Sequence, residues 1–120
     1  MSDNYSRKQN TNGYHIRIKR RINLGEDLLR KVRAVSNGID DLVERDGRVA
    51  GWLTENRHEV QRIYTDESIA GGLPTATGID LQDSSYQDIL EELERIVLGR
   101  IRGLQELIKK TRDWDGLAPA

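Results

Sequence analysis

The sequence predicts an all-α protein: an antiparallel helical hairpin or small helix bundle, oligomeric, with a flexible basic N-terminal arm. Apolar residues recur at spacings of three and four along two long stretches, which is the pattern of a helix with one buried face. A short stretch alone alternates apolar and charged residues in the manner of a strand. At 120 residues, the chain is expected to form one domain.

The composition predicts a thin core. Hydrophobic residues make up 36% of the chain and charged residues 32%, and there are two Trp, four Tyr and no Phe. Aromatic side chains supply much of the apolar area that a fold buries, so a monomer with few of them has little to bury. We therefore expect copies of the chain to pool their apolar surface in a homo-oligomer.

Several classes of protein are excluded or disfavoured by what the sequence lacks. The absence of cysteine excludes disulfides, thiolate chemistry and zinc sites built on Cys. No apolar run approaches the roughly 18–20 residues of a spanning helix, so membrane insertion is not expected. The polar start of the chain lacks the apolar region of a secretory signal. A cytoplasmic protein is therefore expected.

Charge is sorted along the chain although the net charge is only −1. Residues 1–24 carry six basic side chains against one acid, a net charge of +5. Residues 58–95 carry two basic side chains against nine acids, a net charge of −7. A local field of one sign acts on partners even when the whole chain is nearly neutral.

The basic N-terminal segment, residues 1–21, is interpreted as a flexible arm. Its first 14 residues are polar and turn-prone. Residues 15–19 alternate apolar and charged side chains, which indicates either a short strand or the lead-in to a helix. Basic side chains neutralise phosphates, and those assigned to nucleic-acid contact are Arg17, Lys19, Arg20 and Arg21.

A short basic strand followed by helices is similar to the ribbon-helix-helix family of dimeric DNA-binding repressors, over about residues 14–53. The resemblance implies that two copies pair their strands in the major groove, with His15, Arg17 and Lys19 facing the bases. The chain departs from the family at Asp40 and Asp41, whose carboxylates would repel phosphate where the family approaches the DNA backbone. We do not assign the chain to this family.

The helical domain is expected over residues 22–113. Its first helical stretch covers about residues 25–64, where apolar side chains recur at helical spacing. Gly38 and Gly47 each weaken a helix by about 1 kcal/mol, and the expected break lies near Gly47. The pattern leaves open whether this stretch is one helix or two stacked helices.

A glycine-rich connection at residues 66–83 is expected to be a flexible loop, and a last helix is predicted at residues 85–112, capped by Ser84 or Ser85. Acids at its start and bases at its end complement the helix dipole, and they would pair across two antiparallel copies. Residues 114–120 form a tail. The residues predicted to form the oligomer interface are Trp52, Tyr86, Leu90, Leu93, Val97, Ile101, Leu104 and Ile108.

The candidates for chemistry are weak. Glu55 and His58 have the spacing used in di-iron bundles, but the helical wheel places both away from the apolar stripe, so we expect them to face solvent. The glycine-rich segment 71–78 lacks the Lys-Ser/Thr pair of a phosphate loop. We therefore predict no catalytic residue, no metal, no cofactor and no enzymatic activity.

The predicted function is that of an assembly, adaptor or regulatory protein, which acts through self-association and contacts with a protein partner. The alternative is a small protein that binds DNA or RNA through residues 7–21. Salt dependence separates the two, because phosphate contacts weaken steeply as salt rises and an apolar helix interface does not.

Overall fold

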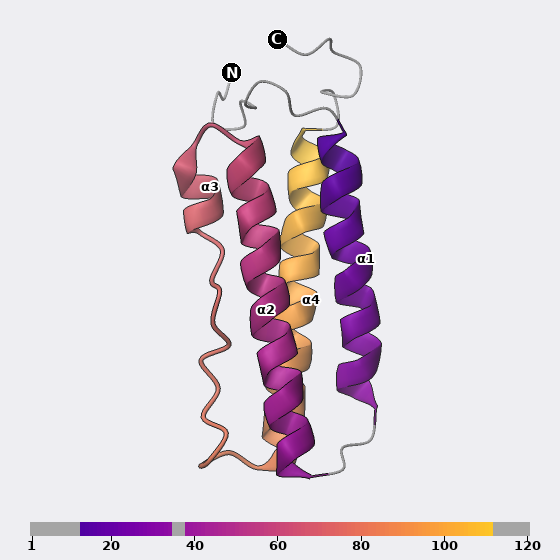
Figure 1. The fold of residues 1–120 in the computed structure, drawn as a ribbon, viewed down its shortest axis with the longest axis vertical. Helices are drawn as coiled ribbons and strands as arrows, with labels where there is room; N and C mark the ends of the chain where they lie inside the picture. The colour runs from indigo at the N-terminus through magenta and orange to yellow at the C-terminus, as the bar shows by residue number, and fades with distance from the viewer. Residues whose placement is uncertain (1–12, 35–37, 112–120) are drawn as a thin grey trace.

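The computed structural model describes residues 13–34 and 38–111. This part of the chain folds into α1 (Tyr14–Arg33), α2 (Ile39–Ile63), α3 (Glu67–Gly71) and α4 (Tyr86–Lys110), with no strand among the described residues. The all-α prediction is confirmed. The three long helices lie side by side, with α1 antiparallel to both α2 and α4 (Figure 1).

Helix α1 begins at Tyr14, inside the segment that we interpreted as an arm. Tyr14, Ile18 and Ile22 are four residues apart and 1%, 1% and 6% exposed, so this part of the chain is held by the core. The strand interpretation of residues 15–19 is wrong: its alternation came from Ile16, which is 65% exposed on the outer face of the helix. The ribbon-helix-helix resemblance fails with it. The rest of the arm, residues 1–12, lies outside the described residues.

The break between the first two helices lies before Gly38, and the prediction of a break near Gly47 is wrong. Gly38 has φ +127°, a backbone conformation that favours glycine, whereas Gly47 lies within α2. Arg45 reinforces the turn: its buried guanidinium donates from Nη1 to the carbonyls of Val32 (3.1 Å) and Ala34 (2.8 Å), at the end of α1. The predicted stretch therefore forms two antiparallel helices, the first ending at Arg33 and the second beginning at Ile39.

The connection between α2 and α4 is more ordered than the flexible loop we expected. Asp66 caps the short helix α3 by accepting a hydrogen bond from the backbone N–H of Ser68 at 2.9 Å. Residues 72–85, which we call the strap, then run the length of the bundle (Figure 1). The strap is needed because α2 and α4 are parallel, so the chain must return to the other end before α4 begins.

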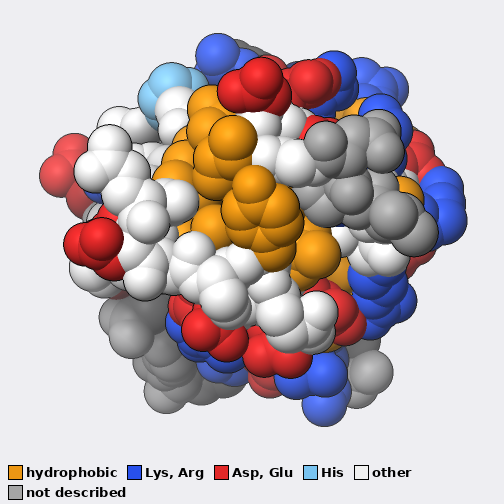
Figure 2. Space-filling view, turned by 90° about the horizontal axis from the view of Figure 1, so that it is seen from below, with side chains coloured by type: hydrophobic (Ala, Val, Ile, Leu, Met, Phe, Trp, Pro, Cys, Tyr) orange, Lys and Arg blue, Asp and Glu red, His pale blue; other side chains and the backbone are white. Residues whose placement is uncertain are grey.

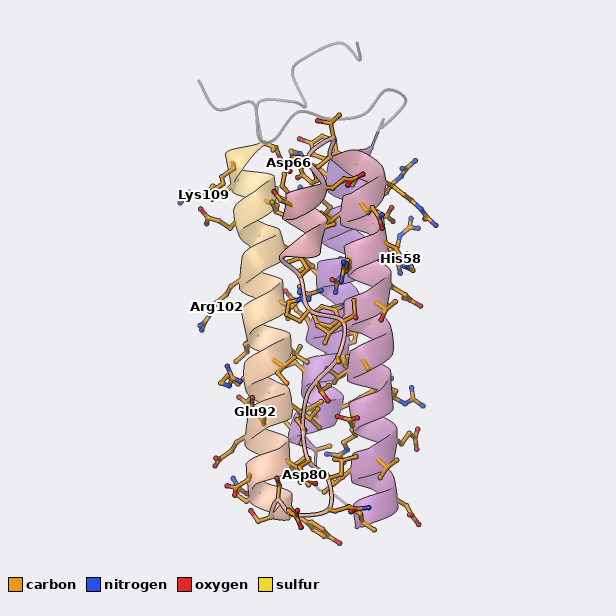
Figure 3. All side chains as sticks on the ribbon, turned by 90° about the vertical axis from the view of Figure 1, so that its left-hand side faces the viewer. His58, Asp66, Asp80, Glu92, Arg102 and Lys109 are labelled. Carbon is orange, nitrogen blue, oxygen red and sulfur yellow. The ribbon has the colours of Figure 1, made fainter. Side chains whose placement is uncertain are left out.

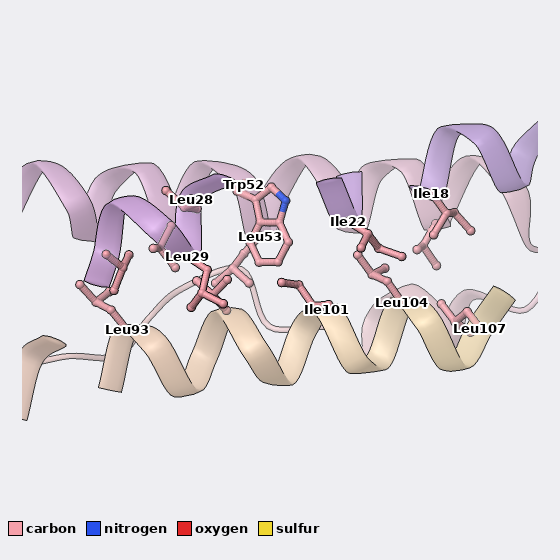
Figure 4. Packing of buried hydrophobic residues seen from close by; sticks show 14 of the residues in the cluster. Ile18, Ile22, Leu28, Leu29, Trp52, Leu53, Leu93, Ile101, Leu104 and Leu107 are labelled. Carbon is pink, nitrogen blue, oxygen red and sulfur yellow. The ribbon is translucent and has the colours of Figure 1, made fainter. Parts of the chain in front are cut away.

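Helix α4 matches its prediction. Ser85 caps it by accepting from the backbone N–H of Asp88 at 3.1 Å, and the helix ends at Lys110. Its apolar stripe packs against α1 and α2, with Leu93, Val97 and Leu104 fully buried (Figure 4). Trp52 of α2 lies in the same core, with Leu28 and Leu29 of α1 nearby (Figure 4). The chain thus builds a continuous core within one copy.

Candidate functional site

The residues predicted for self-association divide into two groups. Five of the eight are buried in the core of one copy: Trp52, Leu93, Val97, Ile101 and Leu104. Their side chains serve the fold and are not available on its surface, which corrects their assignment to an interface. The other three are accessible: Tyr86 is 50% exposed, and Leu90 and Ile108 are half-buried.

Exposed apolar side chains gather at the end of the bundle where α2 and α4 begin. Ile39 is 40% exposed, Val43 is 49% exposed and Tyr86 is 50% exposed. Ile39 and Val43 lie one turn apart on the first turns of α2, and Tyr86 is the first residue of α4. Figure 2 looks onto this end and shows hydrophobic side chains over its middle, with charged side chains around them. We call Ile39, Val43 and Tyr86 the apolar end.

The basic residues assigned to nucleic-acid contact fall into two groups, those without an ion pair and one that is paired. Arg17, Lys19 and Arg20 are exposed on α1 and form no ion pair with any described residue. Arg21 is different, because its Nη1 lies 3.0 Å from Glu55 Oε2 and its Nη2 lies 3.7 Å from Glu59 Oε1. Three of the four cations therefore remain available to an external anion.

A cavity of about 470 Å³ lies between the strap and α4. Gly99 and Gly103, one turn apart on α4, make room for it, since a Cβ at either position would meet no atom within 4 Å. On the strap side the cavity is lined by residues from Gly72 to Thr77, and Leu53 of α2 lies at its inner wall. The strap runs across the groove between α2 and α4 and so covers this space (Figure 3).

Arg100 is the charged group of this cavity, and it is only 6% exposed. Its Nη1 donates to the carbonyl of Leu53 (3.1 Å) and to Oδ1 of Asn56, and its Nη2 donates to the carbonyl of Pro74. One side chain thus joins α4 to α2 and to the strap. Burial first and then the positive charge of Arg57 together lower the pKa of Arg100 to about 10.

The strap has a second attachment to the bundle. The hydroxyl of Thr77 donates to Oδ1 of Asp46 at 2.5 Å, and its oxygen accepts from the backbone N–H of Ile79 at 3.4 Å. With the bond from Arg100 to Pro74, this fixes both ends of the cavity wall. The glycine-rich segment therefore forms one wall of a cavity large enough for a small molecule.

Arg100 is not among the residues predicted for a site, because it was grouped with the bases at the end of the last helix. A signal was present: Leu93, Val97, Arg100 and Leu104 follow one another at spacings of four, three and four, so Arg100 occupies a core position. Glycines at positions 99 and 103 flank it on the same helix. An arginine at the spacing of the buried residues indicates a buried charge, and two glycines near it on the same helix indicate room for a cavity.

The weak candidates for chemistry lie where the helical wheel placed them. Glu55 and His58 are exposed, and Figure 3 shows His58 on the side of α2 that faces away from α4. Among the acids at the start of α4, Glu92 is paired with Arg95, whose hydrogen bond holds the pKa of Glu92 below its ordinary value. Within residues 13–34 and 38–111, no three His, Asp or Glu side chains come together in a way that would hold a metal ion.

None of the helices in the described ranges is both long and apolar enough to cross a bilayer. Comparison with protein-family models, with curated proteins and with solved structures finds no match for this chain.

Proposed function

We propose that this chain is a non-enzymatic assembly or adaptor protein whose contact surface is the apolar end, with a second copy of the chain as its first partner. The observation that carries the proposal is the clustering of Ile39, Val43 and Tyr86, each at least 40% exposed, at one end of the bundle. Exposed apolar side chains that gather on one surface mark contact sites more often than scattered ones do.

The size of the apolar end sets the strength of the contact. The bundle measures 23 × 20 Å across, which allows on the order of 450 Å² of contact per copy, against roughly 800 Å² per partner in a standard interface. Charged side chains toward the edge of this face would add specificity more than affinity. We therefore expect a weak dimer, with a dissociation constant of about 100 µM or higher.

Sedimentation velocity of the full chain between about 10 µM and 1 mM tests this proposal. Tyr86→Lys places a charge in the apolar end, and Gln87→Lys makes the same change in charge at the next, polar position. The weight-average mass of the wild type should rise with concentration, that of Tyr86→Lys should stay at one chain, and Gln87→Lys should follow the wild type. A wild-type mass that stays at 13.7 kDa throughout would remove self-association.

A second function is favoured by one specific observation, the unpaired cations Arg17, Lys19 and Arg20 on α1. They lie within one turn of α1, and Arg17 and Arg20, three residues apart, share a side of the helix from which they can contact phosphates of DNA or RNA. Arg21 does not belong to this set, because Glu55 and Glu59 already neutralise it.

Fluorescence anisotropy of labelled DNA and RNA at about 50 and 200 mM salt tests this alternative. The test variant replaces Arg17, Lys19 and Arg20 by Gln, and a control replaces three exposed cations elsewhere, Arg62, Arg102 and Lys109, by Gln. Nucleic-acid binding through α1 predicts steep salt dependence that only the first variant loses. Equal loss in both variants would show that net charge alone governs the binding.

A further inference from the structure

We propose that the cavity between the strap and α4 binds a small carboxylic acid with an apolar body, whose carboxylate the guanidinium of Arg100 holds. This inference is independent of the apolar end, which lies on other residues.

The first argument is the charge of Arg100. Buried charges in proteins are paired, because an unpaired charge away from water is strongly unfavourable. Two other buried charged side chains follow this rule. Arg45 lies 2.9 Å from Asp41, and Glu59 lies 3.7 Å from Arg21. Arg100 instead contacts three neutral oxygens and no carboxylate of the described chain.

The side chains around Arg100 add further positive charge and no negative charge that would pair with it. The guanidinium of Arg57 acts on Arg100 and repels it. Arg57 itself forms no ion pair with a described residue. Arg95 also lines the cavity, but Glu92 already pairs with it. A bound anion would therefore meet the positive charges of Arg100 and Arg57, which no described carboxylate neutralises.

The second argument is the set of donors that Arg100 has left. A guanidinium has five N–H groups, and the bonds to Leu53, Asn56 and Pro74 use three of them. The N–H of Nε and one N–H of Nη2 have no acceptor among the described residues. Nε is also not fully enclosed. Neighbouring guanidinium N–H groups match the two oxygens of a carboxylate, so the unused donors fit that ligand.

The third argument is the lining of the cavity, which selects the ligand class. Leu53, Leu73, Pro74 and Ile96 present apolar surface, and the two glycines of α4 present backbone. The hydroxyl of Thr77 is already engaged with Asp46. A volume of about 470 Å³ lies within the range of small-molecule sites, roughly 300–1,000 Å³. These walls suit an aliphatic or aromatic acid, whereas a phosphate would need more donors than the cavity offers.

The test uses 4-phenylbutyrate as the probe and 4-phenylbutanamide as its uncharged match, titrated into the full ¹⁵N-labelled chain. Binding in the cavity predicts saturable shifts at the backbone N–H groups of residues 72, 73 and 75–77 and of residues 99–103. The amide compound should bind about tenfold to a hundredfold more weakly, since it loses the charge-assisted hydrogen bonds. Equal affinities for the two compounds, or shifts confined to other residues, would overturn the proposal. Tighter binding of inorganic phosphate would overturn the ligand class.

Two variants separate ligand binding from the structural role of Arg100. Gly103→Leu fills the cavity and leaves Arg100 in place, and its Cβ meets no atom within 4 Å, so the fold should be retained. It should abolish binding of 4-phenylbutyrate. Arg102→Gln removes a neighbouring cation that points away from the bundle and should leave affinity unchanged (Figure 3). Undiminished binding by Gly103→Leu, or an equal loss in Arg102→Gln, would place the probe elsewhere and contradict the assignment.

Discussion

Gly25 of α1 faces the indole of Trp52 of α2 so closely that a methyl group at Gly25 would overlap the ring, with its Cβ 2.9 Å from Cε2. The indole is only 5% exposed. The indole is also tied to α1 one turn earlier, because its Nε1 donates to the carbonyl of Arg21 at 2.7 Å. The indole of Trp52 therefore packs in the space that a side chain at position 25 would fill.

Gly25→Ala should destabilise the protein by about 1–3 kcal/mol, because overpacking exceeds the gain of about 1 kcal/mol in helix propensity. Gly51→Ala is the matched control, since Gly51 is also helical and a Cβ there meets no atom within 4 Å. That control should stabilise by up to about 1 kcal/mol. Urea unfolding measures both changes. Stabilisation by Gly25→Ala would mean that Trp52 does not occupy this position.

Arg45→Met should cost about 2–4 kcal/mol in the free energy of unfolding. The change removes the donors to Val32 and Ala34 and leaves Asp41, whose carboxylate pairs with Arg45 at 2.9 Å, without its cation. Arg48→Met removes an exposed pair with Glu44 from the same helix and should cost less than about 0.5 kcal/mol. Thermal unfolding followed by circular dichroism measures the two side by side. Equal effects would show that the turn does not depend on Arg45.

The carboxyl of Asp66 should titrate below its ordinary pKa of 3.8, because it accepts hydrogen bonds from the hydroxyl and then from the backbone N–H of Ser68. A lowered pKa in the folded chain stabilises the fold above the unfolded value, and that contribution is lost as the pH falls through the folded value. Ser68→Ala should move the pKa of Asp66 back toward 3.8, but not fully, because the backbone donor remains. Carboxyl NMR of the labelled chain measures both. An unchanged pKa in Ser68→Ala would contradict the contact.

Val97→Asp should abolish the fold, whereas Tyr86→Lys should abolish only self-association. Val97 is fully buried, so Asp there should unfold the chain, at a cost of about 3 kcal/mol or more. Tyr86 is half exposed, so Lys there should keep the helical signal and lose only self-association. Far-ultraviolet circular dichroism measures the fold, and sedimentation velocity measures the association. A folded, monomeric Val97→Asp would mean that the α4 stripe meets another copy after all.

Much of this fold could be predicted from the sequence, and α4 shows why. A serine cap, a regular apolar stripe and acids before bases all agree along residues 85–110, so each local signal supports the same helix. The start of α1 was missed because Ile16 mimics strand alternation over five residues. The longer spacing from Tyr14 through Ile18 and Ile22 is helical, and it outweighs the short pattern once the core forms.

The turn, the strap and the cavity could not be predicted in the same way. Whether Gly38 or Gly47 breaks the helix depends on which one adopts positive φ, and composition does not specify this. The crossing of the strap follows from α2 and α4 being parallel, which is a property of the whole bundle. Arg100 acquires its role only when Leu53, Asn56 and Pro74 come together from three segments.

The central claim, that the apolar end is the contact surface of this protein, is tested most directly by dilution of the ¹⁵N-labelled full chain from about 1 mM to about 20 µM. The account predicts concentration-dependent shifts at the amides of Ile39, Val43 and Tyr86, with the amides of α1 unchanged. Spectra that do not change on dilution, or changes centred on Arg17 and Arg20, would contradict it.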